Sequence, residues 1–174
     1  MNPKPQCLTT PHLCLQLLRA ADEDALVDLL MNEEIAKTYM VPEFASREEA
    51  VALCRRIQMQ SQGEERLVYG IYLADGLIGV INEVYRDDRK IELGYVIHPE
   101  HKNRGYATEA LTAMISGAFS VGFTTVMAGA FEENHASMRV MEKSGMHPTG
   151  ETEEVSYRGK TYRCPCYEIQ KGTA

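Results

Sequence analysis

The chain has 174 residues, a length typical of one domain, at which a fold buries about 70% of the surface that its unfolded chain exposes. Hydrophobic residues make up 44% and charged residues 25%, which is ordinary globular composition and argues against disorder. With 18 Lys and Arg against 25 Asp and Glu, the net charge of −7 disfavours general binding to nucleic acids or anionic membranes, because neutralising phosphates requires a basic surface.

The first third of the chain predicts a strand and two helices. Leu13–Leu18 is the predicted strand, and Asp22 is placed to cap a helix that runs through Leu30. Ser46 and Glu49 form a capping box, in which the serine accepts from the amide three residues on and the glutamate reaches back. The helix that follows has an apolar face made of Ala50, Leu53, Cys54 and Ile57.

Three strands follow in the middle of the chain. Residues 66–74 and 77–85 are rich in β-forming residues, and Asp75-Gly76 between them is a strong hairpin signal. A third strand is predicted over 90–98. It ends at Pro99, which has no N–H to donate to a ladder.

The remaining elements complete an α/β fold of the α+β type. They are a helix over 104–121, a strand over 123–131, a helix over 136–143 and strands over 150–157 and 162–169. The order β-α-α-β-β-β-α-β-α-β-β predicts a mixed, mostly antiparallel sheet flanked by helices, in which the one crossover through the helix over 104–121 is parallel and right-handed. No repeat or linker interrupts it, so we expect a single domain over residues 1–174.

Residues 110–131 carry no charge, and about 20 apolar residues would span a bilayer. The stretch contains several Ser, Thr and Gly residues, however, and its pattern changes at Gly122 from helical spacing to a β-branched run. We therefore predict a helix, a turn and a buried strand. The apolar stretch Leu13–Leu18 is too short for a signal peptide, so a cytoplasmic protein with no membrane partner is expected.

The five cysteines show no zinc-finger spacing, and Cys164 and Cys166 are the only close pair. We interpret them as free thiols in a reducing compartment, with a redox or metal role as the alternative. His98 and His101 resemble half of a metal site but lack a third ligand nearby, so no metal is predicted.

A loop followed by a helix at residues 98–110 predicts an anion site. Such a place collects unpaired backbone amides and the positive end of a helix dipole, which together bind phosphate. Gly105 allows close approach of the backbone to a ligand, and Lys102 and Arg104 add positive charge. By itself the pattern also fits an ordinary helix start, and the chain has neither a P-loop nor a dinucleotide fingerprint.

Two motifs resemble those of the GNAT acetyltransferase superfamily. The loop Lys102-Asn-Arg-Gly-Tyr-Ala107 resembles its pyrophosphate loop, Q/R-x-x-G-x-G/A, with Lys102 as a donor in place of Gln or Arg. Residues 134–137, Asn-His-Ala-Ser, and 142–146, Glu-Lys-Ser-Gly-Met, are similar to its second motif, N-x-x-S/A followed by E-K-x-G-F. Residues 92–95, Glu-Leu-Gly-Tyr, are closest to the branch containing the ribosomal-protein alanine N-terminal acetyltransferases. The resemblance spans Thr9 to Ile169.

The resemblance implies an acetyl-CoA site and no metal. In such enzymes the strand before the loop pairs its backbone with the pantetheine arm, and the residues at those positions here are Tyr95, Val96 and Ile97. The amides of the loop cradle the pyrophosphate, at positions occupied here by Lys102, Asn103, Arg104, Gly105, Tyr106, Ala107 and Thr108. Asn134 and Ser137 fall where the family contacts the cofactor arm near its sulfur, although Asn134 also fits a helix N-cap.

Two residues are the candidate catalytic groups. A primary amine is mostly protonated at pH 7 and attacks only when neutral, so a base assists the reaction. Glu92 stands where this branch often has a glutamate, and a solvated surface carboxylate is its alternative role. Many relatives have a tyrosine where this chain has Met141, so Ser137 or water is the candidate donor to the departing thiolate.

The resemblance places the acceptor between the early helices and the last hairpin, here around Asn32–Tyr39 and Ser156–Arg163. Carboxylates and a phenol in or near this region would favour a cationic amine: Glu33, Glu34, Glu83 and Tyr39. We expect N-acetyl transfer to a small-molecule or protein amine by direct attack in a ternary complex, by a monomer or homodimer. A non-catalytic acyl-CoA-binding module and a structural subunit of a larger assembly are the alternatives.

Overall fold

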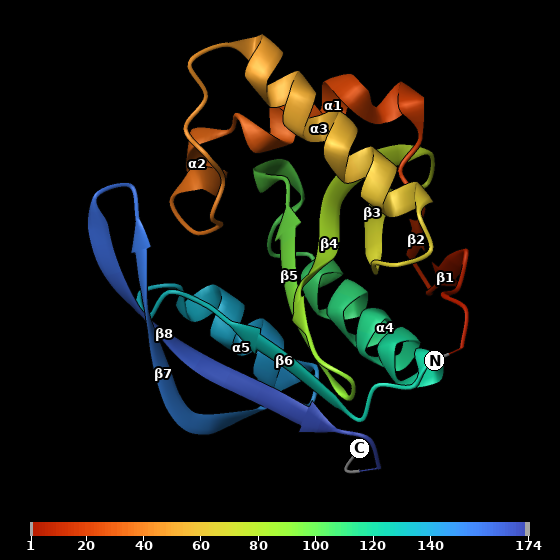
Figure 1. The fold of residues 1–174 in the computed structure, drawn as a ribbon, viewed down its shortest axis with the longest axis vertical. Helices are drawn as coiled ribbons and strands as arrows, with labels where there is room; N and C mark the ends of the chain where they lie inside the picture. Colours follow the sequence, from red (N-terminus) through yellow and green to blue (C-terminus); the bar gives the residue numbers. More distant parts are fainter. Residues whose placement is uncertain (1, 173–174) are drawn as a thin grey trace.

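The computed structural model of the chain describes residues 2–172, which form an eight-stranded sheet in the order β1-β2-β3-β4-β5-β6-β8-β7 (Figure 1). The strands are β1 (Cys7–Thr9), β2 (Leu13–Gln16), β3 (Val68–Leu73), β4 (Gly76–Arg86), β5 (Lys90–Ile97), β6 (Thr125–Gly129), β7 (His147–Tyr157) and β8 (Lys160–Gln170). The α-helices are α1 (Glu23–Leu30), α2 (Glu33–Ala36), α3 (Arg47–Gln62), α4 (Tyr106–Val121) and α5 (His135–Lys143), and short 3-10 turns cover Ala20–Asp22 and Pro99–His101.

The topology confirms the expected fold class. Neighbouring strands pair antiparallel throughout this sheet except β5 and β6, which are parallel and joined by α4. Gly105 immediately precedes α4 and Gly122 immediately follows it, with φ angles of 84° and 127° that glycine adopts without steric cost. The stretch 110–131 therefore divides into a helix and a strand as expected, and no helix among residues 2–172 is long and apolar enough to cross a membrane.

Several local expectations were wrong in detail. The expected element order lacks β1, the short helix α2 and both 3-10 turns. Leu73 pairs with Gly76, so the hairpin turn is Ala74-Asp75, one residue earlier than expected, with Ala74 at a φ of 50°. Asp22 occupies the N-cap position of α1 as expected, but its side chain does not cap the helix amides, because its carboxylate accepts from the backbone N of Arg19 at 2.6 Å and from the Tyr72 hydroxyl.

Two apolar cores lie on opposite faces of the central strands. Because side chains alternate along a strand, Tyr69, Ile81 and Leu93 pack on the α4 side, while their neighbours Val68, Val80 and Val96 pack towards the N-terminal helices. The first core includes Leu111, Met114 and Ile115 of α4, and the second includes Leu26 and Leu30 of α1 with Ala50 and Cys54 of α3. Helices thus cover both faces of β3–β5, and β5 borders both cores.

Candidate functional site

β5 leaves part of its backbone edge without a strand partner. β6 pairs with β5 only at Lys90, Ile91 and Glu92, after which the two ribbons part (Figure 1). The N–H of His98 donates to Ile78 of β4 at 2.8 Å. Because hydrogen-bonding directions alternate along a strand, the N–H and C=O groups of Tyr95 and Ile97 point to the opposite, open side. Val96 turns its backbone towards β4 instead, where its oxygen faces Gly79.

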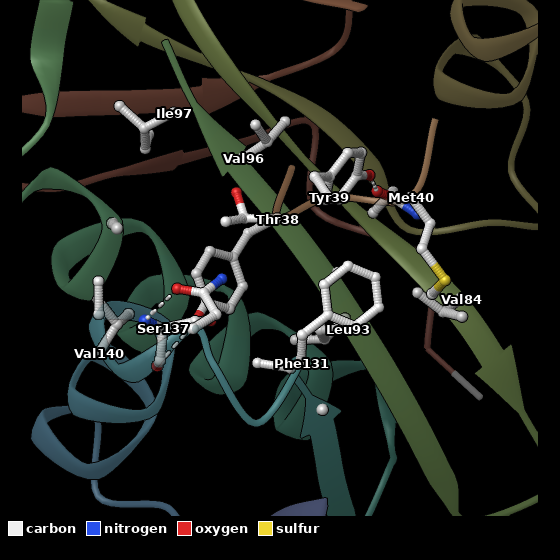
Figure 2. Close-up of a pocket in the computed structure, with 18 of the residues that line it drawn as sticks. Thr38, Tyr39, Met40, Val84, Leu93, Val96, Ile97, Phe131, Ser137 and Val140 are labelled. Carbon is white, nitrogen blue, oxygen red and sulfur yellow. Dashed lines mark hydrogen bonds between the residues drawn. The ribbon is translucent and has the colours of Figure 1, made fainter. Parts of the chain in front are cut away.

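A cavity of about 940 Å³ occupies the space beside this edge. Figure 2 shows it between Tyr39 and Met40 on one side and Ser137 and Val140 of α5 on the other. It brings together nearly all of the site residues predicted from sequence, namely Glu92, Tyr95, Val96, Ile97, Lys102, Asn103, Gly105, Tyr106, Ala107, Thr108, Asn134 and Ser137. Arg104 is the exception, since its side chain is exposed and does not line the cavity.

One end of the cavity is suited to an anion. A Cβ added to Gly105 would meet no atom within 4 Å, and no side chain caps the amides that begin α4. Lys102 of the loop and Arg139 and Lys143 of α5 line this end, and the Nδ1 atom of His101 is buried there with no hydrogen-bond partner among residues 2–172. Free amides, a helix N-terminus and basic side chains therefore converge on open space.

The next part of the cavity contains a hydrogen-bonded Tyr95–Ser137 pair. The Tyr95 hydroxyl lies 2.7 Å from Ser137 Oγ and 3.2 Å from the Ser137 carbonyl oxygen. Burial raises the pKa of Tyr95 to about 12, although the serine hydrogen bond opposes this shift. The Asn134 side chain accepts from the Ser137 amide at 3.1 Å, which confirms the N-cap interpretation. Met141 is fully buried and does not line the cavity.

Glu92 lies at the other end, and its carboxylate makes no hydrogen bond or ion pair with any residue in 2–172. Burial raises the pKa of its carboxyl group, and the nearby carboxylate of Glu153 raises it further. The thiols of Cys164 and Cys166 line the same region, and burial raises their pKa values too, so they remain neutral. This end of the cavity is therefore acidic and only partly solvated.

The structure changes the expected acceptor region. Glu33 and Glu34 do not line the cavity, and Glu34 pairs with Lys37. Glu83 does line it, but its side chain is buried against the Arg86 guanidinium at 2.9 Å and accepts from the Leu67 amide at 3.2 Å.

The walls of the acceptor region are joined by Tyr157. Its hydroxyl lies 2.9 Å from the Ala36 carbonyl oxygen and 3.2 Å from that of Val41, which ties the β7–β8 hairpin to the segment after α2. No residue of Ser156–Arg163 lines the cavity, whereas Val155 and Cys164 on either side of that range do.

Sequence reasoning missed several lining residues. Ala136, Arg139, Val140 and Lys143 lie on one face of α5 at helical spacing, a pattern that could have been read from the second motif. No sequence pattern predicts that Phe131 and Met40 line the cavity, because tertiary packing brings them there. Phe131, for example, stacks on Tyr162 with ring centroids 4.2 Å apart. Among residues 2–172, no three His, Cys, Asp or Glu side chains gather as metal ligands.

Comparison with known proteins gives a consistent family. The family model described as "Acetyltransferase (GNAT) domain" matches residues 12–147. The "Uncharacterized N-acetyltransferase YoaA" of Bacillus subtilis (strain 168) is 29% identical over 170 residues, which cover 94% of this chain and 96% of that protein.

Solved structures share the fold at lower identity. The Microcin C7 self-immunity acetyltransferase MccE, in complex with acetyl-CoA and AMP, has a TM-score of 0.81 at 17% identity, covering 92% of this chain and 93% of that one. The ribosomal L7/L12 alpha-N-protein acetyltransferase RimL has a TM-score of 0.81 at 16% identity, covering 97% and 94%.

Proposed function

Since the chain belongs to the GNAT acetyltransferase family, we propose that it transfers the acetyl group of acetyl-CoA to a primary amine by direct attack in a ternary complex. The main support for this proposal is that three features lie along one cavity. They are the open space at Gly105 and the first amides of α4 (the anion cradle), the open edge of β5, and the Glu92 carboxylate, which has no partner among residues 2–172. Residues 1–174 would act as one domain, and a cytoplasmic location agrees with five free cysteines among residues 2–172.

The cavity fits acetyl-CoA in both charge and shape. The open space at Gly105 and the first amides of α4 would hold the pyrophosphate, aided by Lys102, Arg139 and Lys143. The free backbone groups of Tyr95 and Ile97 would bond the amides of the pantetheine arm as an added strand does. When bound, acetyl-CoA supplies a thioester carbonyl that a neutral amine can attack.

Glu92 would remove the proton from the incoming ammonium group. It has no cation partner among residues 2–172, and its pKa is raised by burial and by Glu153, which makes its carboxylate a stronger base than an ordinary glutamate. Glu153 lines the same cavity and its charge acts on Glu92, so it would help to hold the cationic amine before the proton is removed. The acidic end of the cavity therefore suits an ammonium ion.

Ser137 would donate a hydrogen bond to the departing sulfur, with Tyr95 as a positioning residue. If the Tyr95 hydroxyl donates to Ser137 Oγ across their 2.7 Å contact, the serine proton is left free to point into the cavity. A phenol with a pKa of about 12 is too weak an acid to protonate a thiolate whose conjugate acid has a pKa near 8.5, so Tyr95 orients the serine rather than giving up its proton.

The anion cradle can be tested with Gly105→Glu, which places bulk and negative charge against the pyrophosphate. Losing amide–phosphate hydrogen bonds of about 1.5–3 kcal/mol each should weaken acetyl-CoA binding at least tenfold by calorimetry. Gly150→Glu is the matched control, because Gly150 has the same φ of 84° and equally open surroundings outside the cavity. Equal affinities in the two folded variants, or binding of ATP and NADH as strong as that of acetyl-CoA, would contradict the assignment.

The base can be tested with Glu92→Gln in a pH–rate profile. A carboxylate acts as a base only when ionised, so the wild-type rate should fall as pH drops through the raised pKa of Glu92. The variant should lose about 10²–10⁴ in kcat near neutral pH, and the deficit should shrink as pH approaches the pKa of the amine. Glu65→Gln, at an exposed position outside the cavity, should match the wild type. A wild-type pH–rate profile in the Glu92→Gln enzyme would show that Glu92 is not the general base.

The Tyr95–Ser137 pair can be tested with a double-mutant cycle. Tyr95→Phe and Ser137→Ala should each lower kcat about tenfold, and the double variant should lose no more than Ser137→Ala alone, because Tyr95 acts through the serine. KM for acetyl-CoA should change little in Tyr95→Phe, and the exposed Tyr85→Phe serves as the control. Effects that multiply in the double variant would assign Tyr95 a separate role.

A further inference from the structure

A second cavity of about 210 Å³ adjoins the main one. Five residues line both, namely Tyr39, Met40, Gln60, Asn82 and Val96. The other residues around this side pocket come from α1, α3, β3, β4 and the segment after α2, and all are apolar: Leu26, Leu30, Val41, Pro42, Leu53, Ile57, Val68 and Val80. Pockets for whole small molecules are about 300–1,000 Å³, so the side pocket has room for only part of a ligand.

Of the three polar side chains at the boundary of the side pocket, those of Tyr39 and Asn82 are already paired, and that of Gln60 is exposed. The Tyr39 hydroxyl donates to Asn82 Oδ1 at 2.6 Å, and the Asn82 amide donates to the Glu83 carbonyl at 3.1 Å. No charged side chain lines the pocket. The rest of the lining is apolar, so a charged or hydroxylated group that passes this boundary would lose its water without gaining a partner, whereas an apolar group would gain from burial.

β5 connects the side pocket to the proposed base. Glu92, Gly94 and Val96 alternate onto the same face of the strand, about 7 Å from one to the next. Glu92 stands at the acidic end of the main cavity, and Val96 lines the side pocket. Gly94 between them presents no side chain, and a Cβ there would lie 3.0 Å from Val84 Cγ2 and 3.6 Å from Tyr39 Cε2. The side chain of Tyr39, which lines both cavities, therefore lies over Gly94, so the side pocket begins about 7 Å along the strand from Glu92.

We propose that the acceptor is a primary amine carrying one compact apolar group, with the amine at Glu92 and Glu153 and the apolar group in the side pocket. The proposal rests on the acetyltransferase function proposed above. The charge of the main cavity holds the ammonium ion, and the apolar lining of the side pocket selects the group attached to it. Polyamines and aminoglycosides are poor acceptors on this account, because each would carry a second charge or hydroxyl groups into an apolar pocket.

The acceptor series n-propylamine, n-butylamine, n-pentylamine and isoamylamine measures the pocket directly. Burying one methylene group is worth about 0.8 kcal/mol, so kcat/KM should rise about fourfold with each added carbon until the pocket is full. Spermidine and putrescine should react no better than n-propylamine. Leucinamide, which mimics a peptide N-terminus, and isoamylamine then distinguish a peptide N-terminus from a simple free amine as the source of the same chemistry.

Free leucine belongs in the same series because Arg66 also lines the main cavity. A carboxylate beside the reacting amine would face Glu92 and Glu153, so leucine should react more slowly than leucinamide. Faster reaction of leucine than of leucinamide would show that Arg66 binds the carboxylate of the substrate, and it would overturn the proposed class of apolar amine acceptors.

Two variants of one residue test whether the side pocket causes the preference. Ile57→Phe should fill the pocket and lower kcat/KM for n-pentylamine at least tenfold, and lower it much less for n-propylamine, which fills less of the pocket. Ile57→Ala should enlarge it and move the optimum to a longer chain, a change that does not depend on the phenylalanine variant folding. Met59→Phe is the control on the same helix, because Met59 is 74% exposed and lines neither cavity.

The outcomes separate this proposal from the function on which it rests. Failure to bind CoA would contradict the proposed function itself. Normal CoA binding and turnover with no dependence on chain length, or a preference for spermidine, would overturn the apolar acceptor alone. If CoA binds and no amine turns over, the CoA complex should still be stabilised against heat by n-pentylamine more than by n-propylamine. Equal stabilisation would likewise overturn the proposal.

Discussion

The pairing of β5 with β6 over three residues and no further is the constraint on which the site depends. Unpaired backbone N–H and C=O groups inside a fold are costly unless water or a ligand satisfies them, so an interior strand with a free edge favours a partner that pairs like a strand. α4 makes the separation possible, because it carries the chain from the end of β5 over one face of the sheet to the start of β6. Its N-terminus therefore lies at the end of the open edge, where the amides from Tyr106 onward are free for an anion.

Because side chains alternate along β5, its open edge and its two faces present different groups to the cavity. Tyr95 and Ile97 present free backbone at the edge, and the Tyr95 side chain reaches Ser137 of α5. On the opposite face, Glu92 and Val96 border the acidic region and the second core. Tyr157 joins the walls above them by bonding the carbonyls of Ala36 and Val41. The groups proposed to bind the pyrophosphate and those proposed to bind the ammonium ion thus lie at opposite ends of one cavity.

Local sequence patterns predicted most of the fold and most of the residues around the proposed anion cradle. The helix start at Gly105 and the strand before it are encoded by glycine and proline chemistry and by hydrophobic spacing, so nearly all predicted cradle residues line one cavity. Arg104 does not line the cavity, because adjacency in a loop does not fix the direction of a side chain, and its role in the site stays a prediction. The acceptor region stays a prediction: Ile35, Thr38 and Tyr39 of the expected Asn32–Tyr39 segment line the cavity, whereas no residue of Ser156–Arg163 does. Glu83 pairs with Arg86, and Glu33 and Glu34 do not line the cavity, because tertiary packing decides these contacts. The Tyr95–Ser137 contact joins residues 42 positions apart and has no periodic signal.

Residue-resolved amide hydrogen exchange with and without CoA tests the central claim most directly. The amides of Tyr95 and Ile97 point away from β4 and should exchange markedly more slowly when CoA is bound, because the cofactor arm would pair with them. The Val96 amide, which already faces β4, should change little and provides the internal reference. Protection confined to the loop at Gly105, with Tyr95 and Ile97 unchanged, would contradict the account, because the cofactor would then bind without using the open edge of β5.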